Sequence, residues 1–290
     1  MTRTNKASHN RLANVLHGKM MKPLLKILFA VFLFFTGNQI VADNLQEGNR
    51  LFKAEKYSEA MNYFMKSDTV NNPKAMNRIG YLYDEGLGVE RNHVEAFKWY
   101  RKAAEAGLPV AQFNLGLSYE QGQGVAKNIH AAAQWFLKAA EQHYPPAEMK
   151  MGYLAAKGLG IKKDYQEAMK WYRQAAEHGD NSAYADIGIM YAHGYGVKKD
   201  PNHAVQYYIL GAERGDTDAQ ALLGTSYAYG KGITQDTEKA LYWYKTAAQN
   251  GNINAMKELG SIYTKGRLGV KPDLKEAQRW NDMAEKADKQ

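Results

Sequence analysis

Apolar and small residues recur along most of the chain at helical spacing, and the pattern repeats every 36 residues. An alanine stands four residues before an aliphatic–glycine pair, and two further glycines follow each pair. The pair marks the register six times: Ile79-Gly80, Leu115-Gly116, Met151-Gly152, Ile187-Gly188, Leu223-Gly224 and Leu259-Gly260. A fixed period of this length predicts stacked supersecondary units that bury their faces against one another.

Each block of this repeat predicts two helices. The first helix runs from the alanine to just before the two further glycines. The second begins after a short polar residue that can cap a helix: Asn92, Asn128, Asp164, Asp200, Asp236 and Asp273. It then carries an aromatic pair such as Trp99-Tyr100, whose tryptophan we expect in the core. Most second helices end at a glycine suited to a left-handed stop (Gly107, Gly179, Gly215, Gly251), whereas His143 takes that column in the second block.

The two ends of the array differ from the blocks between them. Residues 43–72 contain a shorter unit without the glycine loop, which predicts a capping helix pair with a tight turn. Residues 73–290 then hold the six repeats and end in a polar capping helix. Polar outer faces at both ends are what a one-dimensional stack needs for solubility.

The repeat resembles a known family. The series Ala-x3-Leu-Gly-x2-Tyr-x2-Gly-x-Gly-Val, then Asp, then Ala-x2-Trp-Tyr-x2-Ala-Ala-x2-Gly is similar to the Sel-one-like repeat (SLR), a relative of the tetratricopeptide repeat, over about residues 74–287. The unit at 45–67 looks closer to a tetratricopeptide repeat. The resemblance implies an all-α, right-handed superhelix (solenoid) of six helix pairs plus a capping pair, with a concave groove. It also implies an adaptor role in macromolecular complexes.

Residues 1–42 have the order of a secretory signal. Lys22 and Lys26 precede an apolar run over 27–35, and small residues stand before Asp43. We expect cleavage between Ala42 and Asp43, with the start of the signal at Met1 or Met21. The apolar run is shorter than the roughly 20 residues needed to span a bilayer. The mature protein is therefore expected in the periplasm or outside the cell, without stable membrane insertion.

Composition narrows the candidate chemistry. The chain has no cysteine, which excludes disulfides, thiolate metal sites and a cysteine nucleophile. Its net charge is +8, but residues 1–42 hold six basic residues and no acid, which leaves 32 basic and 30 acidic residues beyond them. A nearly neutral mature chain gives little support to a nucleic-acid partner, although helical-repeat RNA binders use similar helix pairs.

The titratable residues predict no catalytic, cofactor or metal site. No two histidines of the mature chain stand four residues apart, and no HExxH motif occurs. Each histidine is expected in a separate, distant loop, which would not give the converging ligands that a metal needs. We therefore expect a non-enzymatic protein without cofactors. An envelope hydrolase is the remaining enzymatic alternative, and it would require titratable groups gathered in one cleft.

Recognition should depend on first-helix positions that vary from block to block. We expect partner-binding residues at Asn77, Tyr81, Asp84, Phe113, Leu117, Glu120, Met149, Tyr153, Lys157, Ile189, His193, Thr225 and Tyr229. Their middle section is apolar and aromatic, as in protein-binding grooves. The leading hypothesis is an envelope scaffold or adaptor that holds an extended peptide or an amphipathic helix. An immunity protein that neutralises a secreted toxic effector fits the same features.

Overall fold

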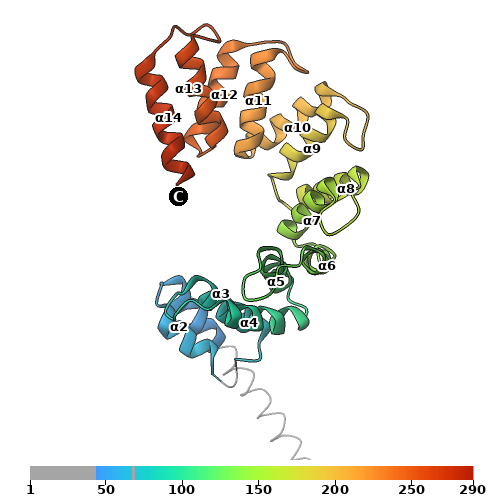
Figure 1. Cartoon of the computed structure of the whole chain (residues 1–290), viewed down its shortest axis with the longest axis vertical. Helices are drawn as coiled ribbons and strands as arrows, with labels where there is room; N and C mark the ends of the chain where they lie inside the picture. The colour runs from blue at the N-terminus through green and yellow to red at the C-terminus, as the bar shows by residue number, and fades with distance from the viewer. Residues whose placement is uncertain (1–43, 67–68, 290) are drawn as a thin grey trace, which may run out of the picture. The chain divides into compact units, whose positions relative to one another are not determined.

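Helices joined by short turns make up the computed structural model, which describes residues 44–66 and 69–289 (Figure 1). No strand occurs in these residues. Residues 44–53 are helical and are followed by a regular series: α2 (Tyr57–Phe64), α3 (Pro73–Glu85), α4 (His93–Glu105), α5 (Pro109–Gln121), α6 (Ile129–Ala140), α7 (Pro145–Lys157), α8 (Tyr165–Glu177), α9 (Ala183–His193), α10 (Pro201–Glu213), α11 (Thr217–Tyr229), α12 (Thr237–Gln249), α13 (Ile253–Lys265) and α14 (Leu274–Asp288). The predicted all-α fold of helix pairs is confirmed.

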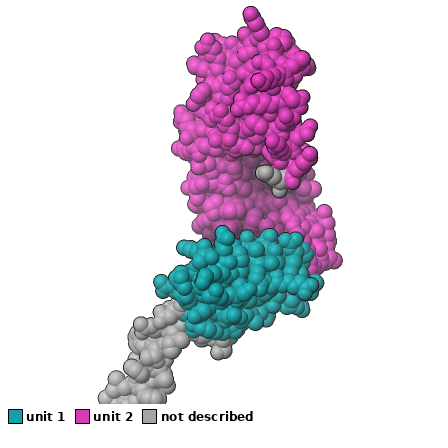
Figure 2. All heavy atoms as spheres, turned by 90° about the vertical axis from the view of Figure 1, so that its left-hand side faces the viewer, with its two compact units in different colours: residues 1–106 teal, residues 107–290 magenta. Residues whose placement is uncertain are grey.

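The chain divides into two compact units at residues 106 and 107, each described by itself (Figure 2). The first unit holds the helical residues 44–53 and α2 to α4. Its core gathers Leu51, Phe64, Ile79 and Leu82. Residues 44–53 and α2 are two short helices, and Glu55 takes a left-handed conformation in the tight turn between them.

The second unit is a stack of helix pairs. Helices α5 and α6, α7 and α8, α9 and α10, α11 and α12, and α13 and α14 pack as hairpins. Each second helix then packs on the first helix of the next pair. The apolar core therefore continues from pair to pair as a series of clusters, such as the one formed by Phe136, Met151 and Leu154.

Local sequence signals set the ends of these helices. Every predicted cap accepts hydrogen bonds from the first turn of its helix; Asn128, for example, accepts from the backbone N–H of Ala131 at 3.0 Å. Gly107, Gly179, Gly215 and Gly251 have φ between 86° and 98°, so the predicted left-handed stops are confirmed. His143 adopts the same left-handed region, with φ 59°.

The aromatic pair of each second helix packs differently from the prediction. The ring that is fully buried is the second of the pair: Tyr100, Phe136, Tyr172, Tyr208 and Tyr244. The tryptophans Trp99, Trp135, Trp171 and Trp243 are half-buried, and three of them pack against the edge of a core cluster. Only Trp280 of the sixth repeat is buried in the core as predicted. The buried ring lies over the central glycine of the first helix, where a Cβ would collide with it. This close contact explains why a glycine is needed at that position of the first helix.

The predicted secretory signal lies outside the described residues. Among the residues that the structure does describe, none of the helices has the length and hydropathy needed to span a membrane.

Candidate functional site

Three pockets lie along the first helices of the helix pairs in the second unit. They lie between α7 and α9, between α9 and α11, and between α11 and α13. Each is bounded by two first helices and contains the buried tyrosine of the second helix between them: Tyr172, Tyr208 or Tyr244. We call this set the pocket row. Six predicted partner-binding residues line it: Tyr153, Lys157, Ile189, His193, Thr225 and Tyr229.

The first pocket, between α7 and α9, has a volume of about 390 Å³. Tyr153 of α7 is 43% exposed there, and Ile189 of α9 contributes an apolar wall. Exposed Lys157 and Lys163 stand at the pocket. This pocket therefore joins an aromatic and aliphatic interior to a basic rim.

One acid in this pocket has an altered proton affinity. Burial, together with the nearby carboxylates of Asp218, Asp216 and Asp180, raises the pKa of Asp186 to about 6. Lys157 opposes the shift. Desolvation and like charge both favour the protonated form, so burial is the main cause of the raised pKa and the neighbouring carboxylates add to it.

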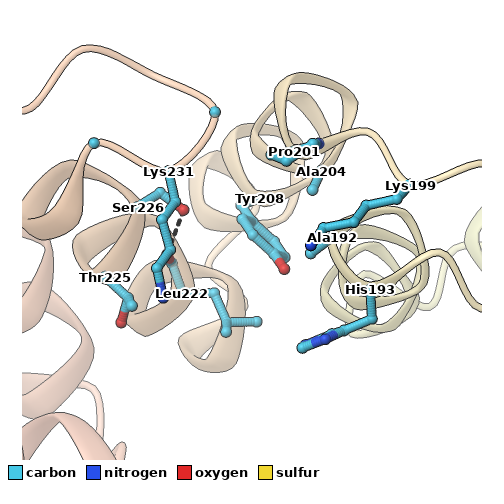
Figure 3. A pocket seen from close by; sticks show the side chains of 12 residues that line it. Ala192, His193, Lys199, Pro201, Ala204, Tyr208, Leu222, Thr225, Ser226 and Lys231 are labelled. Carbon is cyan, nitrogen blue, oxygen red and sulfur yellow. Dashed lines mark hydrogen bonds between the residues drawn. The ribbon is translucent and has the colours of Figure 1, made fainter.

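The second pocket, between α9 and α11, has a volume of about 560 Å³. Figure 3 shows His193 and Leu222 on opposite sides of the Tyr208 ring. Burial raises the pKa of Tyr208 to about 12, so its hydroxyl remains protonated at neutral pH. Lys199 and Lys231 line the same pocket and are exposed. It repeats the combination of an apolar interior and basic side chains.

The third pocket, between α11 and α13, has a volume of about 260 Å³ and is more polar. Tyr229 is 52% exposed, and its hydroxyl accepts a hydrogen bond from Arg267 at 3.1 Å. Arg267 also pairs with Glu258 at 3.0 Å. Thr225 accepts a hydrogen bond from the hydroxyl of Tyr244 at 3.0 Å. These bonds hold the pocket side chains in defined positions.

The other predicted residues of the second unit lie outside the three pockets. Phe113 is half-buried, with its ring centroid 5.4 Å from that of Phe136, and Leu117 packs against the same cluster. Met149 packs against the next cluster. Glu120 forms an ion pair with Lys150 at 2.8 Å. The three apolar side chains therefore give much of their surface to packing between repeats.

Asn77, Tyr81 and Asp84 belong to the first unit. Asn77 is half-buried on α3, and Tyr81 is exposed with its ring centroid 5.8 Å from that of Phe52. Asp84 bonds His93 Nδ1 at 2.7 Å and accepts from the Tyr100 hydroxyl at 3.4 Å. Asp84 therefore joins α3 to α4.

Sequence reasoning missed several pocket residues, among them the tyrosines beneath the pockets and the lysines Lys163 and Lys199 beside them. A signal for the lysines was present, because Lys127, Lys163 and Lys199 occupy one column, five residues after a left-handed glycine. The tyrosines could not be recognised in advance, because a fully buried ring gives no sign in the sequence that it also borders a pocket.

The expectation that the histidines lie in distant loops is wrong for one pair. His143 and His178 are 35 residues apart in sequence, yet their ring centroids lie 4.5 Å apart. The carboxylate of Glu148, from the start of α7, lies beside both imidazoles. The stacking of one repeat on the next brings these three residues together.

The fold and the pocket row define a helical-repeat scaffold, and the comparisons give its family. The Sel1 repeat model matches six consecutive segments: residues 73–108, 109–144, 145–180, 181–216, 217–252 and 253–286. The chain therefore belongs to the Sel1 repeat family, as its repeat predicted, and it is a scaffold suited to protein–protein interaction.

Solved structures support this assignment. The chain is 69% identical to a Sel1 repeat protein from Oxalobacter formigenes, with a TM-score of 0.79 over 84% of this chain and 99% of that one. It is 30% identical to c5321, described as a protective antigen of uropathogenic Escherichia coli strains with an SLR fold, with a TM-score of 0.64 over 85% of this chain and 61% of that one. The immunity protein Pa5087 from Pseudomonas aeruginosa shares the fold at 21% identity and a TM-score of 0.53, over 74% of this chain and 82% of that one. Among curated proteins, none matches the chain.

Proposed function

We propose that the protein is an exported, non-enzymatic scaffold that captures a protein partner by inserting side chains of that partner into the pocket row. The observation that carries the proposal is the recurrence of one pocket design in three successive gaps between first helices. A segment lying along these helices would meet an equivalent anchor site at each repeat. Anchoring by successive repeats is how helical grooves read extended or helical peptides.

The pockets are also held in place before a partner arrives. Tyr208 is buried beneath the second pocket, and Tyr229 is tied to Arg267 beside the third. A preformed surface loses less conformational entropy on binding than a flexible one. The pocket row can therefore contribute affinity even where each individual anchor is weak.

The charge around the pockets favours a partner segment with acidic residues beside its apolar anchors. Lys157 and Lys163 lie at the first pocket, and Lys199 and Lys231 lie at the second. Complementary charge steers the encounter and fixes the register of a bound segment. We therefore propose an acidic, amphipathic peptide or helix as the ligand.

The N-terminal sequence supports the proposed export of the protein. The basic, apolar and small residues of 1–42 have the order of a cleaved signal, which would deliver the scaffold to the periplasm. N-terminal sequencing of the protein from a periplasmic fraction should begin at Asp43. An uncleaved chain in the cytoplasm would contradict export while leaving the pocket row untouched.

Site-specific photo-crosslinking tests the binding surface. A crosslinking amino acid placed at Tyr153 or Tyr229 should capture the same partner in the native host. The matched control is Tyr242 on the second helix α12, which is 60% exposed and does not line the row. Capture at Tyr242 equal to that at Tyr153, or no capture at Tyr153 and Tyr229, would contradict the proposed surface.

The identity of the captured protein separates the two biological roles. A sensor or secretion component would support an adaptor, and a toxic effector whose activity falls on binding would support an immunity protein.

A further inference from the structure

We infer that His143, Glu148 and His178 form a binding site for a divalent transition-metal ion, with Zn²⁺ as the ion to test. Each residue offers one ligand atom, and these atoms lie within 4.8 Å of one another. Two imidazoles and one carboxylate, with water as the fourth ligand, are an established zinc coordination set.

The carboxylate is the fixed part of the site. The side chain of Glu148 is 0% exposed, and its oxygens lie 2.8 and 2.9 Å from His178 Nδ1. The second histidine approaches from the other repeat, with His143 Nδ1 3.7 Å from Glu148 Oε1. A tetrahedral zinc ion would hold its ligand atoms about 3.4 Å apart, given bonds of ~2.0–2.2 Å. To reach that spacing, His178 must move away from the Glu148 oxygens by roughly half an ångström, and the exposed His143 side chain must turn toward the other two residues.

The backbone around His143 strengthens the inference. His143 has φ 59°, in the column where Gly107, Gly179, Gly215 and Gly251 stand in other repeats. A left-handed conformation costs a residue with a side chain about 1 kcal/mol or more relative to glycine, so a histidine there destabilises the turn. Metal ligation is a physical reason for placing an imidazole, rather than glycine, at this position.

The C-terminal ends of two helices also favour a cation at this site. His178 caps the C-terminus of α8, and His143 follows the C-terminus of α6 by three residues. The carbonyl ends of helices favour nearby positive charge. An ion there would join the end of the repeat 109–144 to both helices of the repeat 145–180. The site is therefore a clamp between neighbouring repeats, separate from the pocket row.

Titration of the untagged full-length chain with Zn²⁺ tests the site, followed by calorimetry and by thermal melting. We expect a saturable site for one ion, and a melting temperature that rises with zinc. His143→Gly removes one ligand, keeps the Glu148–His178 pair and suits the left-handed turn, so this variant should fold. Glu148→Gln is equally conservative, because Gln112 and Gln220 occupy the same column in other repeats. His203→Ala is the matched control, since His203 is an exposed histidine that lies outside both the cluster and the pocket row.

The variants separate a metal site from a plain hydrogen bond. Loss of an outer-shell partner raises a metal dissociation constant about 10–100-fold, so loss of a direct ligand in His143→Gly or Glu148→Gln should cost at least that much. His203→Ala should bind zinc as the original chain does. Cobalt(II) bound to the original chain should show the intense visible absorption of tetrahedral coordination. No saturable zinc binding, or unchanged binding in both ligand variants, would overturn the inference and leave Glu148–His178 as a buried polar pair.

Discussion

The contact between the central glycine and the buried ring gives a graded test of how the repeats pack. A Cβ added at Gly116 would lie 2.5 Å from Phe136 Cε1, whereas a Cβ at Gly224 would lie 3.0 Å from Tyr244 Cδ1. Carbon atoms pack best at about 3.5–4.0 Å, so the overlap is roughly 1 Å at Gly116 and about half of that at Gly224. The two positions are equivalent in the repeat, and both rings are buried. Gly116→Ala and Gly224→Ala therefore form a matched pair that differs mainly in overlap.

The expected magnitudes follow from two opposing terms. Overpacking of a core costs about 1–3 kcal/mol, while alanine is favoured over glycine in a helix by about 0.8–1 kcal/mol. Gly116→Ala should then lower the free energy of unfolding by about 1–2 kcal/mol, because Phe136 has little free space to move into. Gly224→Ala should be near neutral. The melting temperature should fall by about 2–4 °C for each kcal/mol lost.

Urea unfolding followed by circular dichroism measures both variants, and a double-mutant cycle isolates the contact. Phe136→Leu removes most of the ring, so Gly116→Ala should destabilise that background much less than the original chain. A coupling energy of about 0.5–3 kcal/mol is expected for residues in direct contact. Equal losses in Gly116→Ala and Gly224→Ala, or purely additive effects in the cycle, would refute the packing argument.

Further predictions concern one acid, one cap and one pocket. The pKa of Asp186 is raised to about 6 from a usual value of 3.8, so the folded chain holds its proton more tightly and stability should fall as the pH rises from about 4 to 6. Asp186→Asn should flatten that part of the stability–pH curve and raise stability at pH 7, by an amount on the order of 1 kcal/mol, and an unchanged curve would refute the assignment. Asn128→Ala should destabilise the start of α6 by about 1 kcal/mol in thermal melts, while Asn128→Asp should retain stability; equal melts for the two would mean that the cap contributes nothing. Tyr153→Ala should weaken partner capture in a pull-down with little change in the melting temperature, because Tyr153 is 43% exposed; a clear loss of stability would place Tyr153 in the core instead.

The fold could be predicted from the sequence because its signals are local and are repeated in register. A cap such as Asp200 and a stop such as Gly215 each specify one end of a helix, and the same columns recur from repeat to repeat. The rotation of each first helix could not be predicted to better than about one residue, because it depends on packing against neighbours. Consequently Tyr153 and Ile189 do line a pocket, whereas Phe113 and Leu117 are half-buried against a core cluster.

The histidine cluster shows a second limit of sequence reasoning. Metal motifs are usually sought at short spacings, such as two histidines four residues apart on one helix. In a solenoid, residues about one repeat apart in sequence become neighbours in space. His143 and His178 differ by 35 residues, close to the period of 36, which is the spacing at which such contacts should be sought.

Contacts between residues about one repeat apart also explain a column of buried polar residues, which share one position of the repeat. Gln112 accepts a hydrogen bond from Gln142 at 2.8 Å, and Gln220 accepts one from Asn250 at 3.2 Å. The Glu148–His178 pair has the same separation of 30 residues. A buried polar group is costly unless it is paired, so each residue of this column is constrained by its own partner rather than by the other repeats. The pair can therefore change from two amides to a carboxylate and an imidazole without disturbing the apolar framework. This independence is the physical reason that a repeat scaffold can acquire distinct chemistry in one repeat.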